Sequence, residues 1–124
     1  MKQFELKRTL FGADVIAQVT LLDEGLHILL TGGGRPHVGA VSVADPQGAV
    51  TTQQFPTHKD GVVSERWAQT VSEAGYYPAV VVAGIHYDDL NQKQIDDVVK
   101  LTNDILDELL HMLKAIASKT AICG

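Results

Sequence analysis

Three consecutive glycines, Gly32, Gly33 and Gly34, run directly into Arg35 and, two residues later, His37. Glycine loses more backbone freedom on folding than any other residue, so an uninterrupted triplet requires a reason. The reason is either a tight connection with positive φ angles or a bare backbone whose N–H groups approach a ligand closely. The Arg35 guanidinium adds a fork of donors that matches a phosphate or a carboxylate. The segment therefore predicts an anion or cofactor loop, and the alternative is a glycine-rich strand connection with a surface arginine.

Two further segments place polar side chains where a ligand could meet them. His58 and Lys59 precede a predicted helix that begins at Asp60, and a helix N-terminus favours anions. His86 follows a strongly apolar run, a position where functional loop residues are common. The alternative for the first segment is that Asp60 only caps the helix while His58 and Lys59 are solvated. We take His58, Lys59 and His86, together with the glycine loop and His37, as the candidate binding residues.

The same residues do not form a recognisable catalytic or metal motif. The histidines include no HxH or HxxxH pair, and the single cysteine, Cys123, excludes a CxxC zinc site. Neither Ser42 nor Ser64 lies in a nucleophile elbow. The glycines are contiguous and lead into Pro36, so the dinucleotide fingerprint is absent. We therefore predict no catalytic residue, no metal and a non-enzymatic protein.

Length and composition limit the function classes further. The 124 residues are enough for one domain, residues 1–124, with a single hydrophobic core. The formal net charge of -5 argues against nucleic acid and anionic membranes as partners, because both attract basic surfaces. No apolar run reaches the length of a membrane span, and the N-terminal segment lacks the apolar core of a signal peptide. We expect a cytoplasmic protein.

Hydrophobic patterning predicts the elements that must position these segments. Alternating apolar residues predict strands over 4–10, 13–22, 26–30, 38–44 and 49–53, joined as an antiparallel meander. Helical spacing follows Asp60 and ends at Gly75, a typical C-cap glycine. The apolar run 79–85 predicts a strand covered on both faces, and a capping box of Asn91 and Gln94 begins a last, long helix.

The last helix carries a wide apolar stripe with alternating steps of three and four residues. One small sheet does not need all of this stripe, so we expect part of it, around Leu109 and Met112, to form a homodimer interface. The predicted fold class is α+β: an antiparallel sheet of about six strands with two packed helices, the C-terminal one long. The stripe comprises Ile95, Val98, Thr102, Ile105, Leu109, Met112 and Ile116.

The motifs GGGRPHVGAVS at 32–42 and HKD at 58–60, with the long final helix, resemble those of the LpdD-like family of prenylated-flavin chaperones. The resemblance implies a fold related to that of the proteasome-assembly chaperones, which are often dimeric. It also implies an accessory role: helping a prenylated-FMN-dependent aromatic acid decarboxylase to acquire or mature its cofactor. The implied cofactor is prenylated FMN or FMN, whose phosphate the glycine N–H groups and Arg35 could receive.

Two other function classes remain open from the residues alone. In one, the chain is a protein-assembly chaperone without a small ligand, and the glycines only shape a turn. In the other, it is a small enzyme acting on an anionic metabolite, with His37, His58 or His86 as the acid–base group. The absence of a nucleophile or a carboxylate pair makes the enzyme the weakest of the three.

Overall fold

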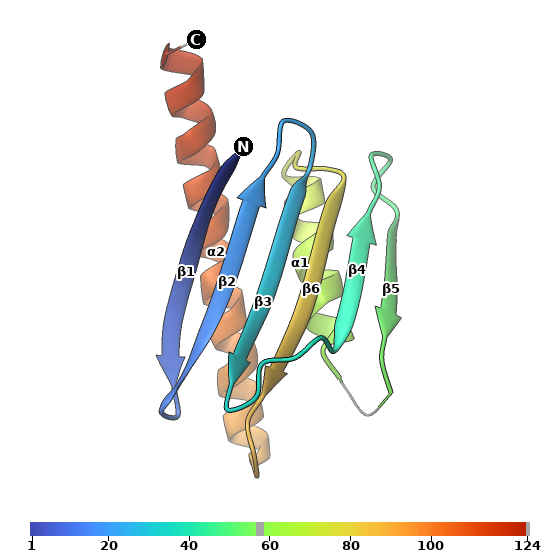
Figure 1. The fold of residues 1–124 in the computed structure, drawn as a ribbon, viewed down its shortest axis with the longest axis vertical. Coiled ribbons are helices and arrows are strands. Elements are labelled where there is room, and N and C mark those ends of the chain that lie inside the picture. Colours follow the sequence, from blue (N-terminus) through green and yellow to red (C-terminus); the bar gives the residue numbers. More distant parts are fainter. Residues whose placement is uncertain (57–58, 124) are drawn as a thin grey trace.

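The chain forms one six-stranded sheet with two helices on one side of it (Figure 1). The computed structural model describes residues 1–56 and 59–123, with side chains as far as residue 118. The predicted α+β class, the strand number and the long C-terminal helix are confirmed. In chain order the elements are β1 (Lys2–Leu10), β2 (Ala13–Leu21), β3 (Leu26–Gly33), β4 (Ala40–Ala44), β5 (Val50–Gln54), α1 (Gly61–Glu73), β6 (Ala79–His86) and α2 (Gln92–Cys123).

The sheet is mixed, which corrects the expectation of a purely antiparallel one. The strand order is β1-β2-β3-β6-β4-β5, and β6 pairs parallel with β3 and antiparallel with β4. The hairpin of β4 and β5 together with α1 forms the crossover that returns the chain to the end where β3 begins. The following strand can then only run parallel to β3. The apolar run 79–85 is therefore a central strand, but the expectation that both of its faces are covered was wrong, because both helices lie on one side of the sheet and Val80 and Val82 are only half-buried.

Two local signals predicted from the sequence are present at the ends of elements. The Asp45 carbonyl accepts from the Gly48 N–H at 3.0 Å, and the Asp45 carboxylate accepts from Gln47 and Ala49, which closes the predicted turn. Asn91 and Gln94 exchange two side-chain-to-backbone bonds of 2.9 Å, so the predicted capping box is present.

The core lies between the sheet and the helices. Trp67 and Val71 of α1 and Ile105 and Leu109 of α2 are fully buried, as is Leu113. The helix stripe is thus used largely inside the chain itself, which removes Leu109 as a dimer contact. Met112 is 37 % exposed and Ile95 is 43 % exposed, so only the margins of the stripe reach the surface.

The other face of the sheet carries no helix (Figure 1). The strand register aligns Leu29, Val82 and Val41 in one row across β3, β6 and β4, and Val80 and Val43 in the next row. These side chains are half-buried or, for Val43, 38 % exposed. We call Leu29, Val41, Val43, Val80 and Val82 the open sheet face.

Across the described part of the chain, neither helix is long and apolar enough to cross a membrane.

Candidate functional site

A pocket of about 370 Å³ opens where α1 begins, β6 ends and α2 starts. It brings together three of the residues predicted from the sequence, His37, Lys59 and His86, with the carboxylate of Asp60. The lining that α2 contributes is mostly aliphatic, so a ligand would meet both polar and aliphatic side chains in this pocket. The lining residues are His37, Lys59, Asp60, Val63, Ile85, His86, Tyr87, Leu90, Ile95, Val98, Val99 and Thr102.

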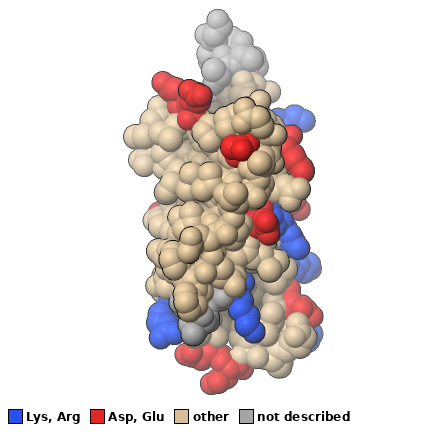
Figure 2. All heavy atoms as spheres, turned by 90° about the vertical axis from the view of Figure 1, so that its right-hand side faces the viewer, with Lys and Arg blue, Asp and Glu red and all other residues tan. Residues whose placement is uncertain are grey.

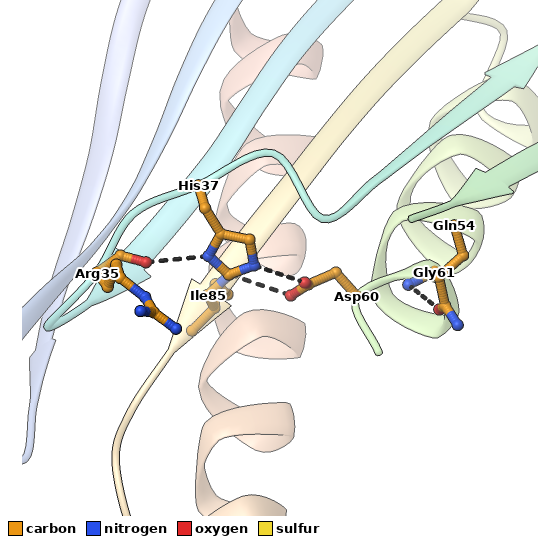
Figure 3. A network of polar contacts seen from close by, with 6 residues as sticks. All are labelled: Arg35, His37, Gln54, Asp60, Gly61 and Ile85. Atoms are coloured by element: carbon orange, nitrogen blue, oxygen red, sulfur yellow. Dashed lines mark hydrogen bonds and ion pairs between the residues drawn. The ribbon is translucent and has the colours of Figure 1, made fainter. Parts of the chain in front are cut away.

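Asp60 holds the polar end of this pocket together (Figure 3). One carboxylate oxygen accepts from the backbone N–H of Ile85 at 3.0 Å, and the other accepts from His37 Nε2 at 3.1 Å. Asp60 stands at the N-cap of α1, as predicted, but its side chain makes no capping bond. Instead Gln54 Oε1 accepts from the Gly61 N–H at 2.9 Å. The expected capping role of the Asp60 side chain was therefore wrong, because β6 and His37 occupy both of its oxygens.

The His37 ring is fixed at both nitrogens. Nδ1 donates to the Arg35 carbonyl at 2.9 Å, and Nε2 donates to the Asp60 carboxylate at 3.1 Å. Both ring nitrogens therefore have a hydrogen-bond partner within the chain. The arrangement is a histidine–aspartate pair whose side chains are 17% and 11% exposed. His37 thus links the segment before β4 to the start of α1.

His86 and Lys59 are the more accessible basic side chains of the pocket. The His86 ring packs edge-on against the His37 ring at a centroid distance of 6.4 Å, and its Nε2 lies 2.9 Å from Asp88 Oδ1. Lys59 lines the pocket from the segment that leads into α1. The Arg35 side chain extends toward the end of β6, beside His37 (Figure 3), although Arg35 does not line the pocket wall.

Close strand packing accounts for two of the three glycines. A Cβ on Gly32 would lie 2.7 Å from the Val15 Cα, so β2 requires a bare residue there. Gly33 has a φ of +80°, and a Cβ on it would lie 1.9 Å from the His86 carbonyl oxygen. The Gly34 N–H already donates to that oxygen at 2.9 Å. A side chain at Gly33 would therefore be strained both by its φ angle and by the lack of space.

Sequence reasoning missed two other glycines that shape the site. A Cβ on Gly39 would lie 2.0 Å from Asp60 Oδ2, and one on Gly84 would lie 1.5 Å from the His37 carbonyl oxygen. Each allows the 34–39 segment to lie against β6 and α1. In the sequence, a glycine beside an apolar run only weakly indicates close packing. The fold is needed to show which neighbouring group occupies the space of the missing side chain.

The apolar wall was also missed, because its residues were assigned to the core stripe of the last helix. Val98 and Val99 of α2 lie there beside Leu90 and Ile95. Tyr87 closes one side: its hydroxyl donates to the Ala13 carbonyl at 3.2 Å and its ring meets Phe11 edge-on at 5.8 Å. Burial, and secondarily the Asp14 carboxylate, raise the pKa of the Tyr87 phenol, so the hydroxyl keeps its proton at neutral pH.

His58 lies outside the described residues, so its part in the site stays a prediction. Among residues 1–56 and those from 59 onward, no three metal-binding side chains gather into a group that could hold an ion.

Comparison with known families aligns residues 10–114 with the prenylated flavin chaperone LpdD-like domain. The chain belongs to this family. The resemblance carried by the glycine loop and the HKD segment is thereby confirmed. Protein LpdD of Lactiplantibacillus plantarum is 29% identical over 120 residues, covering 93% of this chain and 87% of that protein.

Solved structures add support for the fold. A chain described as part of a chaperone complex for yeast 20S proteasome assembly superposes with a TM-score of 0.52 at 21% identity. The match covers 93% of this chain and 98% of the yeast chain. The LpdD-like family member therefore has the fold of a proteasome-assembly chaperone, and at this identity the likeness extends no further than the fold.

Proposed function

We propose that this protein is a non-catalytic accessory factor that binds prenylated FMN, or FMN, in the pocket beside α1. In this proposal it helps an aromatic acid decarboxylase in the cytoplasm to acquire or mature that cofactor. The observation that carries the proposal is the mixed lining of the pocket: His37, Lys59 and His86 lie in it together with aliphatic side chains, several of them from α2.

The residues present fit such a cofactor. A flavin mononucleotide joins a dianionic phosphate to an apolar ring system, and this pocket offers cations for the first and Leu90, Val98 and Val99 for the second. Its volume of about 370 Å³ lies at the lower end of the range for small-molecule sites. Lys59 and His86 would hold the phosphate, with Arg35 reaching it from the preceding loop, while the Asp60 pair keeps His37 in place.

Calorimetric titration with FMN and prenylated FMN tests this assignment. Replacing Lys59→Ala removes one charge-assisted bond, worth roughly 1.5–3 kcal/mol, so affinity falls at least about tenfold. Arg35→Lys keeps the charge but loses the fork, so it weakens binding less than Arg35→Ala. Lys114→Ala, on the exposed side of α2, is the matched control and leaves affinity unchanged. Absence of flavin binding by the unaltered protein contradicts the proposal.

A second candidate is a chaperone that binds a protein partner without any small ligand. The observation that favours it is the open sheet face, because aliphatic groups gathered on a surface commonly mark protein contacts. A Val82→Lys substitution at the centre of that face abolishes decarboxylase binding in this account but leaves flavin affinity intact. Pull-down of the purified decarboxylase, with calorimetry in parallel, separates the two candidates.

We also propose that the protein is a homodimer and that neither nucleic acid nor a membrane is among its partners. The net charge of -5 supports the second part. The buried Leu109 excludes the middle of the α2 stripe as the dimer contact, so another surface must serve.

A further inference from the structure

The β5 strand forms an edge of the sheet, and its sequence lacks the charged residues and prolines that commonly protect such edges. Unpaired backbone groups on an edge strand can accept another strand, and natural proteins blunt such edges with charges, prolines or a covering segment. The opposite edge, β1, carries Lys2, Glu5, Lys7 and Arg8. The sequence of β5, Val-Thr-Thr-Gln-Gln, contains neither a charge nor a proline. Seen from this edge, the molecule has a broad surface free of Lys, Arg, Asp and Glu (Figure 2).

The hydrogen bonds to β4 identify which backbone groups of β5 point outward. The Phe55 N–H donates to the Gly39 carbonyl, and the Asp45 N–H donates to the Ala49 carbonyl, both at 2.9 Å. Hydrogen-bonded pairs recur at every second residue of an antiparallel ladder. The backbone N–H and C=O groups of Thr51 and Gln53 therefore also point toward β4. The remaining residues of the strand therefore direct their N–H and C=O groups away from the sheet; they are Val50, Thr52 and Gln54.

These outward groups are self-complementary, and we propose that β5 pairs antiparallel with β5 of a second copy around a two-fold axis at Thr52. In this register Thr52 faces the partner's Thr52 and Val50 faces the partner's Gln54. Each facing pair exchanges both of its N–H···O=C bonds, so every outward group of the strand is satisfied. This inference rests on the homodimer of the proposed function and identifies the surface through which the two copies would pair.

Side chains and symmetry favour a second copy over other strands. Thr51 faces the partner's Gln53 in this register, so no like charges meet across the axis. The contact is isologous and closes at two subunits, whereas pairing β5 with β1 would leave free edges and build a filament. Phe55 follows the strand directly and is 37 % exposed, and it adds apolar surface at each end of the contact.

The pocket and this contact are separate. The residues that line the pocket come from α1, β6, α2 and their neighbouring loops, and none belongs to β5. Failure of the dimer and failure of flavin binding can therefore be told apart in the same samples.

Two double variants test the register with matched substitutions. T51K/Q53K places lysine opposite the partner's lysine twice, and T51K/Q53E places lysine opposite the partner's glutamate at the same positions. Both positions are exposed in the single chain, so both variants keep the fold, as circular dichroism would check. Analytical ultracentrifugation then measures the dimer dissociation constant.

The proposal expects a dimer for the unaltered protein, a dissociation constant raised roughly tenfold or more for T51K/Q53K, and a retained dimer for T51K/Q53E. An unaltered protein that is monomeric at micromolar concentrations overturns the proposal. So does equal behaviour of the two double variants, whether both are dimers or both are monomers. FMN titration of the monomeric variant reports on the pocket independently of this result.

Discussion

The Asp60 carboxylate joins three segments that meet only in the folded chain: the start of α1, the end of β6 and the loop that carries His37. It is 9% exposed, so its bonds are largely shielded from water. A buried acceptor that loses its partners costs about 1–3 kcal/mol, and here the partners would be left unsatisfied as well.

The Asp60→Asn substitution should therefore lower the free energy of unfolding by about 1–3 kcal/mol, because the single amide oxygen can accept from Ile85 but the amide nitrogen cannot accept from His37. Urea unfolding measures the loss. Asp107→Asn, at an exposed position of α2, serves as the control and should change stability by less than about 0.5 kcal/mol. Equal stability of the two variants would show that the Asp60 bonds contribute nothing to the fold.

The glycine triplet offers a comparison between neighbouring positions. Gly33→Ala combines a φ of +80° with a clash against the His86 carbonyl, so it should destabilise the protein by roughly 1–3 kcal/mol or more. Gly34 has no atom within 4 Å of a built Cβ, so Gly34→Ala should be neutral or slightly stabilising. Thermal unfolding distinguishes them, and a Gly34 variant as unstable as the Gly33 variant would contradict the packing explanation.

The sequence indicated several of the residues that line the site, but it did not indicate which contact each of them makes. Lys59, His37 and His86 do meet in one pocket. The sequence could not reveal that His37 is occupied by Asp60, since those residues lie 23 positions apart and meet through α1 and the 34–39 loop. The glycines drew attention as possible ligand contacts, whereas strand packing explains Gly32 and Gly33.

At the scale of elements, the periodicity predicted the strands and helices well, because each has a clear apolar pattern and a turn or cap signal. Strand neighbours were less predictable. The place of β6 between β3 and β4 depends on how α1 packs back over the sheet, and that depends on long-range burial of Trp67 and Val71. A local pattern gives the strand but not its direction relative to β3.

The helix α2 provides a test of how its stripe is used. Leu109 is fully buried, so Leu109→Glu places an unpaired charge in the core and should prevent folding. Met112 is 37 % exposed, so Met112→Glu should leave both the fold and the oligomeric state unchanged. Circular dichroism and light scattering check both variants. A folded but monomeric Met112→Glu protein would return the dimer contact to α2.

At the scale of the whole molecule, the helices leave one side of the sheet bare and build the pocket on the other. The residues that line the candidate ligand site include none of the open sheet face and none of β5. In the proposed function, such an arrangement would let one protein hold a cofactor while its sheet contacts other chains. A second hollow, of about 400 Å³, lies over the first three strands, and its lining includes Gln3, Gln18 and His27.

Backbone NMR of the labelled protein titrated with FMN tests the location of the flavin site most directly, because it reports on every amide at once. Our account predicts chemical-shift changes that concentrate at Ile85, His86, Val98 and Val99. It predicts none at the amides of Gln3, Gln18 and His27, which line the hollow over the first three strands. Shift changes confined to that hollow or to the open sheet face, or no changes at saturating FMN, would contradict the assignment of the pocket.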